Sequence, residues 1–159
     1  MLEPWVAGTD MEFVVVQSRR ILLSYRHWLK RDLMTAAGSA EDQARMLFEA
    51  PFVVASSDAA ADPILNYGNQ AALALWELSW PQFTQTPGRE TAEPMEREAR
   101  ARFLSEVKRS GFIENYQGIR ISGTGRRFKI ERATVWNLLD ERGRFCGQAV
   151  MFKDWSYLP

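Results

Sequence analysis

The side chains that most often perform chemistry in proteins are scarce in this sequence. His27 is the only histidine and Cys146 is the only cysteine. A zinc site built from histidines, or a serine–histidine–aspartate triad, needs more than this. Gly123 and Gly125 are followed by two arginines and fit a tight turn between strands better than a phosphate-binding loop. We therefore predict neither an enzyme of a standard class nor a metal site, and we interpret His27 as a surface or packing residue.

Five aromatic and cationic residues are the candidates for lining a ligand pocket: Trp76, Arg89, Tyr116, Arg132 and Trp136. Arg132 has the same strand parity as Trp136, which directs its side chain to the face that carries the short helices. There it would require a carboxylate partner or an acidic ligand, because a buried unpaired charge is costly. The alternative is a β-bulge or strand end from which Arg132 reaches water. The competing interpretation is core packing for the two tryptophans, and a loop or surface position for Arg89 and Tyr116.

Composition and charge argue against several classes of protein. The 159 residues suit one domain, and a hydrophobic content of 46%, with six Trp and nine Phe, is enough for a packed core. Twenty basic and twenty acidic side chains give a net charge of zero, whereas a nucleic-acid-binding domain usually has a basic excess. No signal peptide is visible, no apolar run is long enough to span a membrane, and one cysteine forms no intramolecular disulfide. We expect a cytoplasmic protein with no nucleic-acid or membrane partner.

The first third of the chain predicts two helices, at residues 11–36 and 40–49. The first has a broad apolar stripe at helical spacing, and the second follows a capping-box sequence that begins at Ser39. We interpret residues 1–50 as a helical arm or cap and residues 51–159 as the main domain.

The apolar stripe of the arm must be covered, because burying each large apolar side chain is worth about 1.5–3 kcal/mol. Two surfaces are available, namely the outer face of the chain's own sheet around Val135, or the same stripe on a second copy. We predict a homodimer with Leu22 and Trp28 in or next to the interface.

The rest of the chain predicts an α+β fold. Two short strands precede helices that begin at Asn69 and Ser79, and three long strands joined by tight turns follow a charged helix at residues 94–109. Pairs such as Glu96 with Arg100 indicate that this helix has a solvated face. The result is a five-stranded antiparallel sheet, in the order 2-1-5-4-3, with short helices on one face. The strands are expected near residues 52–56, 63–67, 112–122, 126–139 and 144–153.

The element order and several local motifs resemble those of PAS domains. The stretch PILNYGNQAALALWELSWPQF resembles the PAS pattern of a strand, an Asn, two Ala, a Leu, an aromatic residue and a Ser. Many PAS domains have a Gly after the aromatic residue, where this chain has Glu77. The stretch LLDERGRFCGQAVMFKDW resembles the PAS ending, in which an Asp-x-x-Gly turn joins the last two strands. The positions that match the first pattern are Asn69, Ala71, Ala72, Leu75, Trp76, Ser79 and Phe83.

Within the PAS superfamily the chain is similar to the MEKHLA family over nearly its whole length. The similarity is carried by PFVVASSDAAADPILNYGNQAALALWELSW, RETAEPMEREARARFLSEVKRSGFIENYQGIRIS and GRRFKIERATVWNLLDERGRFCGQAVMF, with the arm segment SYRHWLKRDL. MEKHLA domains occur at the C-terminus of plant homeodomain–leucine zipper factors and as short bacterial proteins. The chain has no room for a homeodomain or zipper and so resembles the stand-alone bacterial type. The resemblance implies a PAS-like sensory or regulatory module that binds a small molecule or a protein partner. The alternatives are a structural homodimerisation module with a filled core and, less favoured, a small α+β enzyme.

Comparison with PAS domains that hold cofactors predicts that no flavin or haem is bound. Photoreactive flavin domains of the LOV type have a reactive Cys in a helix, whereas Cys146 here falls on a strand. They also have a flavin-binding Gln in the last strand, at a spacing occupied here by Ala149, and we expect Gln148 to point to the other face. Haem PAS domains usually supply a His from the helix before the last three strands, and this helix has none. We therefore expect a colourless protein with no cofactor.

Overall fold

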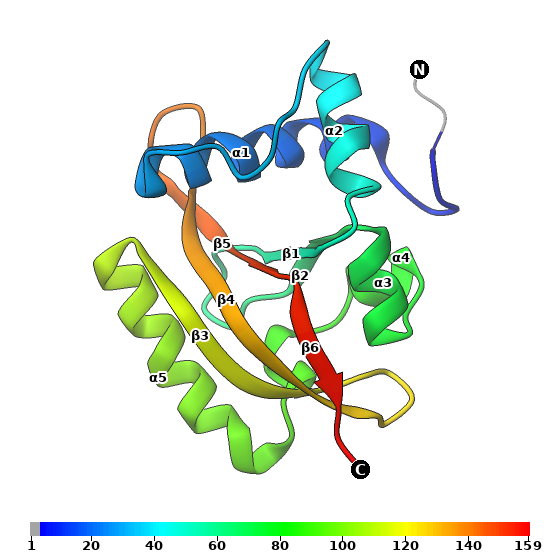
Figure 1. Ribbon diagram of the computed structural model, residues 1–159, viewed down its shortest axis with the longest axis vertical. Helices are drawn as coiled ribbons and strands as arrows, with labels where there is room; N and C mark the ends of the chain where they lie inside the picture. Colours follow the sequence, from blue (N-terminus) through cyan, green and yellow to red (C-terminus); the bar gives the residue numbers. More distant parts are fainter. Residues whose placement is uncertain (1–3) are drawn as a thin grey trace.

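The computed structural model describes residues 4–159, so the first three residues of the predicted 1–50 arm lie outside the described part. The fold is α+β, with one antiparallel sheet in the order β2-β1-β5-β4-β3, and it confirms the predicted fold class and strand order (Figure 1). A further strand, β6, pairs with β4 and was not predicted. The strands are β1 (Val53–Ser57), β2 (Leu65–Gly68), β3 (Phe112–Ile121), β4 (Arg127–Leu139), β5 (Phe145–Phe152) and β6 (Asp154–Tyr157).

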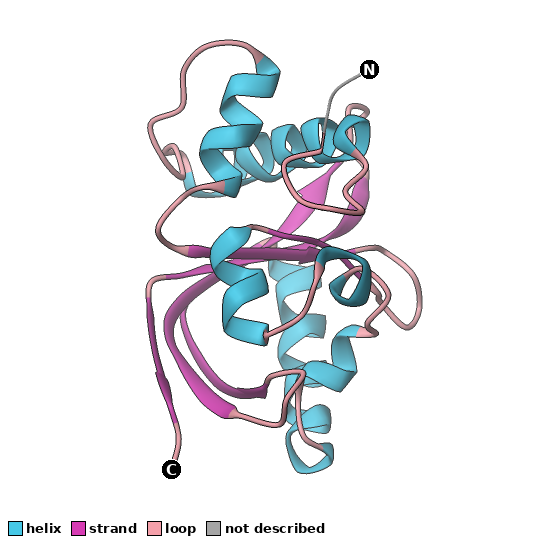
Figure 2. Cartoon of the chain, turned by 90° about the vertical axis from the view of Figure 1, so that its right-hand side faces the viewer, coloured by secondary structure: helices cyan, strands magenta, loops and turns pink. Residues whose placement is uncertain are grey.

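The helices lie on two sides of the sheet (Figures 1 and 2). On one side are α1 (Met11–Leu29) and α2 (Ala40–Phe48). On the other are α3 (Gln70–Trp76), α4 (Trp80–Phe83), the 3₁₀ helix η1 (Gly88–Thr91) and α5 (Pro94–Ser110). Within residues 4–159 no helix combines the length and the apolarity that crossing a bilayer requires.

Helix α1 is shorter than predicted. It begins after Asp10, whose side chain accepts a hydrogen bond from the backbone N–H of Phe13. It ends at Lys30, which adopts a left-handed conformation with φ of 60° and closes the last turn by donating its N–H to the carbonyl of Arg26. The predicted extension to residue 36 is therefore wrong, because a left-handed residue cannot continue the helical ladder. The capping box of α2 is formed as predicted, between Ser39 and Asp42.

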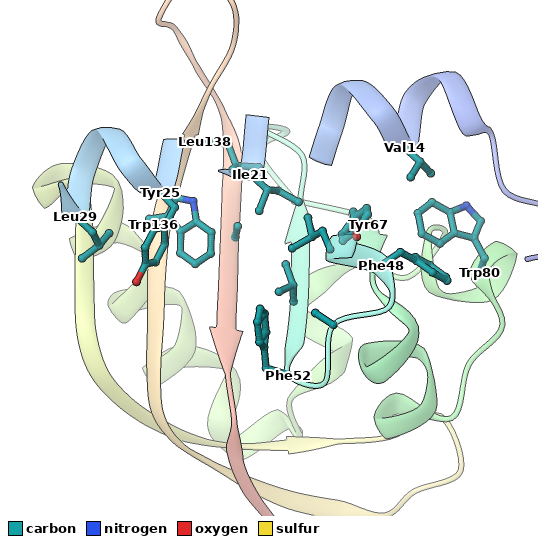
Figure 3. Packing of buried hydrophobic residues seen from close by; sticks show 14 of the residues in the cluster. Val14, Ile21, Tyr25, Leu29, Phe48, Phe52, Tyr67, Trp80, Trp136 and Leu138 are labelled. Atoms are coloured by element: carbon teal, nitrogen blue, oxygen red, sulfur yellow. The ribbon is translucent and has the colours of Figure 1, made fainter. Parts of the chain in front are cut away.

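Helix α1 covers one face of the chain's own sheet. Tyr25 meets Trp136 edge to face, with ring centroids 5.0 Å apart, and Ile21 is fully buried beside them (Figure 3). Trp28 donates its indole N–H to the carbonyl of Asn137 at 2.9 Å. The arm and the sheet thus share one hydrophobic cluster, and the division of the chain at residue 50 stays a prediction.

The two residues predicted for a dimer interface already have partners within the chain. Leu22 is half-buried against the cluster under α1, as is Trp28. The apolar side chains that α1 leaves exposed are Val16 and Leu23. The homodimer stays a prediction, and Val16 and Leu23 are the residues of α1 available for it. His27 is exposed on the same helix, as expected.

Asn69 ties the two sides of the fold together at the start of α3. It is completely buried, and its side-chain amide makes four hydrogen bonds. The oxygen accepts from the N–H groups of Val54 and Ala72, and the nitrogen donates to the carbonyls of Leu47 and Phe52. The predicted helix cap is confirmed, and the same side chain also fixes β1 and the end of α2.

A single residue reverses the facing pattern of β4. Arg132 has φ of 52°, in the left-handed region, and lies between the segment that pairs with β6 and the segment that pairs with β5. Before it, Phe128 and Ile130 face α3 and α4; after it, Ala133 is on that face and Trp136 is on the opposite one, under α1. The prediction that Trp136 faces the short helices is therefore wrong, because parity was counted through a break in the strand.

Candidate functional site

A cavity that is partly open to the surface lies between the sheet and helix α5. Its volume is about 80 Å³. Most of the wall surface is apolar, but several of the lining residues have polar side chains. The principal apolar lining residues are Leu65, Phe83, Phe103, Leu104, Ile130, Val135 and Val150, and the polar ones are Ser56, Ser57, Trp76, Thr91, Arg100, Tyr116, Arg120 and Gln148.

Two guanidinium groups reach this cavity from different elements. Arg120, on β3, is only 8% exposed; it donates to the hydroxyl of Tyr116 at 2.9 Å and to the carbonyl of Ile119 at 2.8 Å. Arg100 comes from α5, and no ion pair or side-chain hydrogen bond joins it to any other described residue. Burial, and then the positive charge of Arg120, lower the pKa of Arg100 to about 10. Arg100 therefore remains charged at neutral pH.

Local sequence on β3 explains why Arg120 points inward. Tyr116, Gly118 and Arg120 alternate along the strand, so their side chains share one face. Gly118 leaves the space that the other two use, since a Cβ there would overlap the Tyr116 hydroxyl. Phe103 of α5 stacks on the Tyr116 ring, with centroids 3.7 Å apart and planes at 16°. These contacts hold the Tyr116 and Arg120 side chains at the cavity wall.

A second glycine makes room for Arg100. A Cβ at Gly88 would lie 2.6 Å from Nη2 of Arg100, so a larger residue in η1 would displace the guanidinium. Arg100 is one turn before Phe103 and Leu104 on α5, both of which line the cavity. It does not pair with Glu96. The prediction that Arg100 belongs to a solvated face is wrong, because its side chain lies on the face that packs against the sheet.

Trp76 and Gln148 supply further N–H donors. The indole nitrogen of Trp76 is buried and has no hydrogen-bond partner among residues 4–159. Gln148 donates to the carbonyl of Leu104 at 3.0 Å and to the side-chain oxygen of Asn137 at 3.2 Å. Gln148 was expected to point away from a cofactor site, but it lines the cavity. Gln148 alternates with Val150, which pairs with the cavity-lining Val135, whereas Ala149 pairs with Trp136 under α1.

The structure brings two of the five predicted pocket residues together, Trp76 and Tyr116. Trp136 lies on the opposite face of the sheet. The side chain of Arg132 is 62% exposed and pairs with Asp154 at 2.9 Å, so its alternative position in water is correct. Arg89 is exposed and ion-paired with an aspartate outside the cavity. The other interpretation of Arg132, an inward cation, does not hold for this residue, and other arginines line the cavity instead.

The residues that sequence reasoning missed left weak signals. Arg120 shares the parity of the predicted Tyr116, with a small residue between them, which indicates a crowded inner face on that strand. Arg100 stands three and four residues before Phe103 and Leu104, at the spacing of one helix face. Neither signal alone distinguishes an arginine that points inward from one that points to solvent. For Arg100 the distinction also depends on where η1 packs, because Gly88 of η1 leaves the space for its guanidinium.

A surface groove continues the cavity outward. It lies between residues 58–63 and α5, has a volume of about 570 Å³, and shares Arg100, Leu104 and Gln148 with the cavity. Its rim is polar, and its three carboxylates are already engaged. Asp58 accepts two backbone N–H groups of its own loop, Asp62 pairs with Arg89, and Glu98 pairs with Arg102. Arg100 thus stands at the boundary between the groove and the interior.

The lining of the cavity suits binding more than acid–base chemistry. Its described lining includes no Asp, Glu, His or Cys, whereas it includes two arginines and Trp76. Among the described residues no cluster of three or more His, Cys, Asp or Glu side chains is placed to hold a metal ion. The site therefore combines positive charge with an apolar wall.

Comparisons with known proteins agree with this architecture. The family model of the MEKHLA domain matches residues 15–157. Homeobox-leucine zipper protein HOX10 of Oryza sativa subsp. indica is 23% identical over 150 residues, which is 89% of this chain and 17% of that protein. Homeobox-leucine zipper protein ATHB-14 of Arabidopsis thaliana is 27% identical over 99 residues, covering 62% of this chain and 12% of that protein. The chain therefore spans less than a fifth of the length of these relatives.

Solved structures show the same fold at low sequence identity. The PAS domain of a protein from Colwellia psychrerythraea superposes with a TM-score of 0.61 at 16% identity, covering 70% of this chain and 92% of that one. A light-oxygen-voltage domain, studied with a flavin analogue, superposes with a TM-score of 0.57 at 15% identity, covering 73% and 84%. At this identity the similarity establishes the fold alone.

Proposed function

The chain belongs to the MEKHLA domain family, and from this premise we propose that it is a PAS-like sensory domain that binds a small molecule in the cavity beside α5. The observation that carries the proposal is the cavity itself, with a largely apolar wall and several polar side chains, among them two arginines. A module that served only to dimerise, with a filled core, would have no reason to keep this space open.

The size of the cavity argues for a ligand of modest dimensions. A single water needs about 10–15 Å³ of such volume, and the cavity offers about 80 Å³. Pockets for drug-sized ligands are larger, at roughly 300–1,000 Å³. Filling the cavity with water alone would leave its apolar wall hydrated, which is unfavourable. A molecule with a short apolar part and one polar group fits these requirements.

Native mass spectrometry of the purified chain, combined with a cavity-filling variant, tests the proposal. We expect wild type to retain an added small mass, or to gain one from a panel of small metabolites. Val150→Phe, which fills the cavity from β5, should abolish it. Val16→Phe adds the same group at an exposed position of α1 and should leave it unchanged. A wild-type chain that binds no member of the panel, and behaves like Val150→Phe throughout, contradicts the proposal.

A further inference from the structure

The arginines of this protein show an unusual division. Ten of them form ion pairs with carboxylates in the described chain, and the side chains of all ten are at least 28% exposed. Six form no such pair among the described residues, and two of these six, Arg100 and Arg120, line the cavity. Desolvation makes pairing most valuable for buried charges and least valuable for exposed ones. The protein thus leaves unpaired the two arginines that most need a negative partner.

We propose that the cavity binds a small carboxylic acid in its ionised form, with the carboxylate held by Arg100 and Arg120 and a short apolar body against the walls formed by Ile130, Val135 and Val150. The inference rests on the proposed function, because it names the ligand class of the same cavity. No residue in the described lining carries a negative charge that could pair with these two arginines.

The donors available match a carboxylate. Arg100 commits none of its five N–H groups to other described residues, so its planar fork is free for a bidentate interaction. Arg120 is oriented by the Tyr116 hydroxyl and the Ile119 carbonyl, which leaves part of its guanidinium for a ligand. Trp76 also lines the cavity, and its buried indole N–H has no partner among the described residues. Two guanidinium groups close enough to lower the pKa of one of them also repel each other, and a shared anion relieves this repulsion.

The walls favour a carboxylate with an apolar body over inorganic phosphate. Phosphate would use the two arginines but would present charged oxygens to Ile130, Val135 and Val150. A short aliphatic chain buries these apolar groups while its carboxylate stays with the arginines. The same surface disfavours an uncharged ligand, because that would leave both arginines without a partner.

Titrations followed by ¹H–¹⁵N NMR at constant ionic strength test this inference with three probes: butyrate, its uncharged isostere butyramide, and inorganic phosphate. We expect saturable binding of butyrate, and binding of butyramide and phosphate at least about 10-fold weaker, as the loss of one charge-assisted hydrogen-bond pair implies. Arg100→Met should weaken butyrate at least about 10-fold. Arg102→Met, an exposed arginine on the same helix, should have no effect.

Each other outcome overturns the inference in a recognisable way. Equal binding of butyrate and butyramide removes the role of charge, while small-molecule binding itself stands. Phosphate that binds as tightly as butyrate removes the preference for a carboxylate with an apolar body. If none of the three binds, the ligand class is wrong, and the comparison of wild type with Val150→Phe in native mass spectrometry decides separately on the proposed function. Should Arg100→Met perturb folding, Arg100→Lys, which keeps the charge and loses the fork, must still weaken butyrate.

Discussion

Replacing Arg100 by methionine should stabilise the ligand-free protein. Methionine is unbranched and flexible and fills a similar path along the wall of the cavity. The substitution removes a partly buried charge that has no partner among the described residues and that lies close to the charge of Arg120. Removing an unpaired interior charge relieves its desolvation penalty and the repulsion of its neighbour.

The pKa of Arg100 gives the scale of the effect. Its fall from the ordinary arginine value to about 10 corresponds to about 3 kcal/mol, because each pKa unit represents about 1.4 kcal/mol. The residue is half-buried, so solvent screening reduces this figure, and we expect a gain of about 1–2 kcal/mol. For a domain of this size such a gain raises Tm by about 2–8 °C. Below about pH 10 the Arg100 side chain is protonated in both the folded and the unfolded chain, so the gain in stability is constant near neutrality. Above about pH 10 the folded protein loses this proton while the unfolded chain keeps it, and the gain shrinks.

Urea and thermal denaturation of the two variants, in buffer without carboxylates, measure this effect. Arg102→Met is the matched control, since Arg102 is exposed and its pair with Glu98 is worth about 0.2–0.5 kcal/mol. An Arg100→Met variant that is less stable than wild type without ligand would refute the reasoning. Such a result would mean that the Arg100 charge is already stabilised in the ligand-free protein, so that it would not require an anionic ligand.

Four other substitutions or conditions follow from the structure. Asn69→Asp replaces a buried N–H donor by an oxygen that faces two carbonyls, so denaturation should show a loss of about 2–4 kcal/mol despite identical shape. Gly147→Ala should destabilise strongly by the same measurement, because Gly147 has φ of 144° and a Cβ there would overlap the carbonyl oxygen of Ser57. Backbone N–H groups lower the pKa of Asp140, so stability that is present above its ordinary pKa near 4 is lost as pH falls further, and Asp140→Asn should flatten this acid limb in pH-dependent thermal melts. If the predicted homodimer forms through the exposed part of α1, light scattering should show that Leu23→Glu yields a monomer of unchanged stability.

Elements bounded by local signals were predictable from the sequence. Ser39 and Asp42 form their capping box because both partners lie within one turn, and Asn69 caps α3 for the same reason. The three long strands follow alternating residues and tight turns, and their order agreed with the PAS resemblance. The end of α1 was missed because Lys30 carries no sequence signal for a left-handed conformation.

The candidate site was predictable in type but only partly in residues. An inward cation on β4 was one of two interpretations of Arg132, and the arginines that line the cavity come from α5 and β3 instead. The error has one source: Arg132 adopts a conformation that only some side chains tolerate, and it reverses the facing of Trp136. Periodicity assigns faces correctly only up to such a break. The approach of Gly88 to Arg100 depends on tertiary packing, which no local pattern encodes.

Two buried tryptophans provide the most direct test of the central claim, that the cavity beside α5 is a ligand site. The indole N–H groups of Trp76 and Trp136 are both buried without a partner in the described chain, but Trp76 lines the cavity and Trp136 lies beneath α1. Their NMR signals, assigned with Trp76→Phe and Trp136→Phe, can be followed during a butyrate titration. The account predicts a saturable shift of the Trp76 signal with the Trp136 signal unchanged. No shift at Trp76, or equal shifts of both signals, would contradict it.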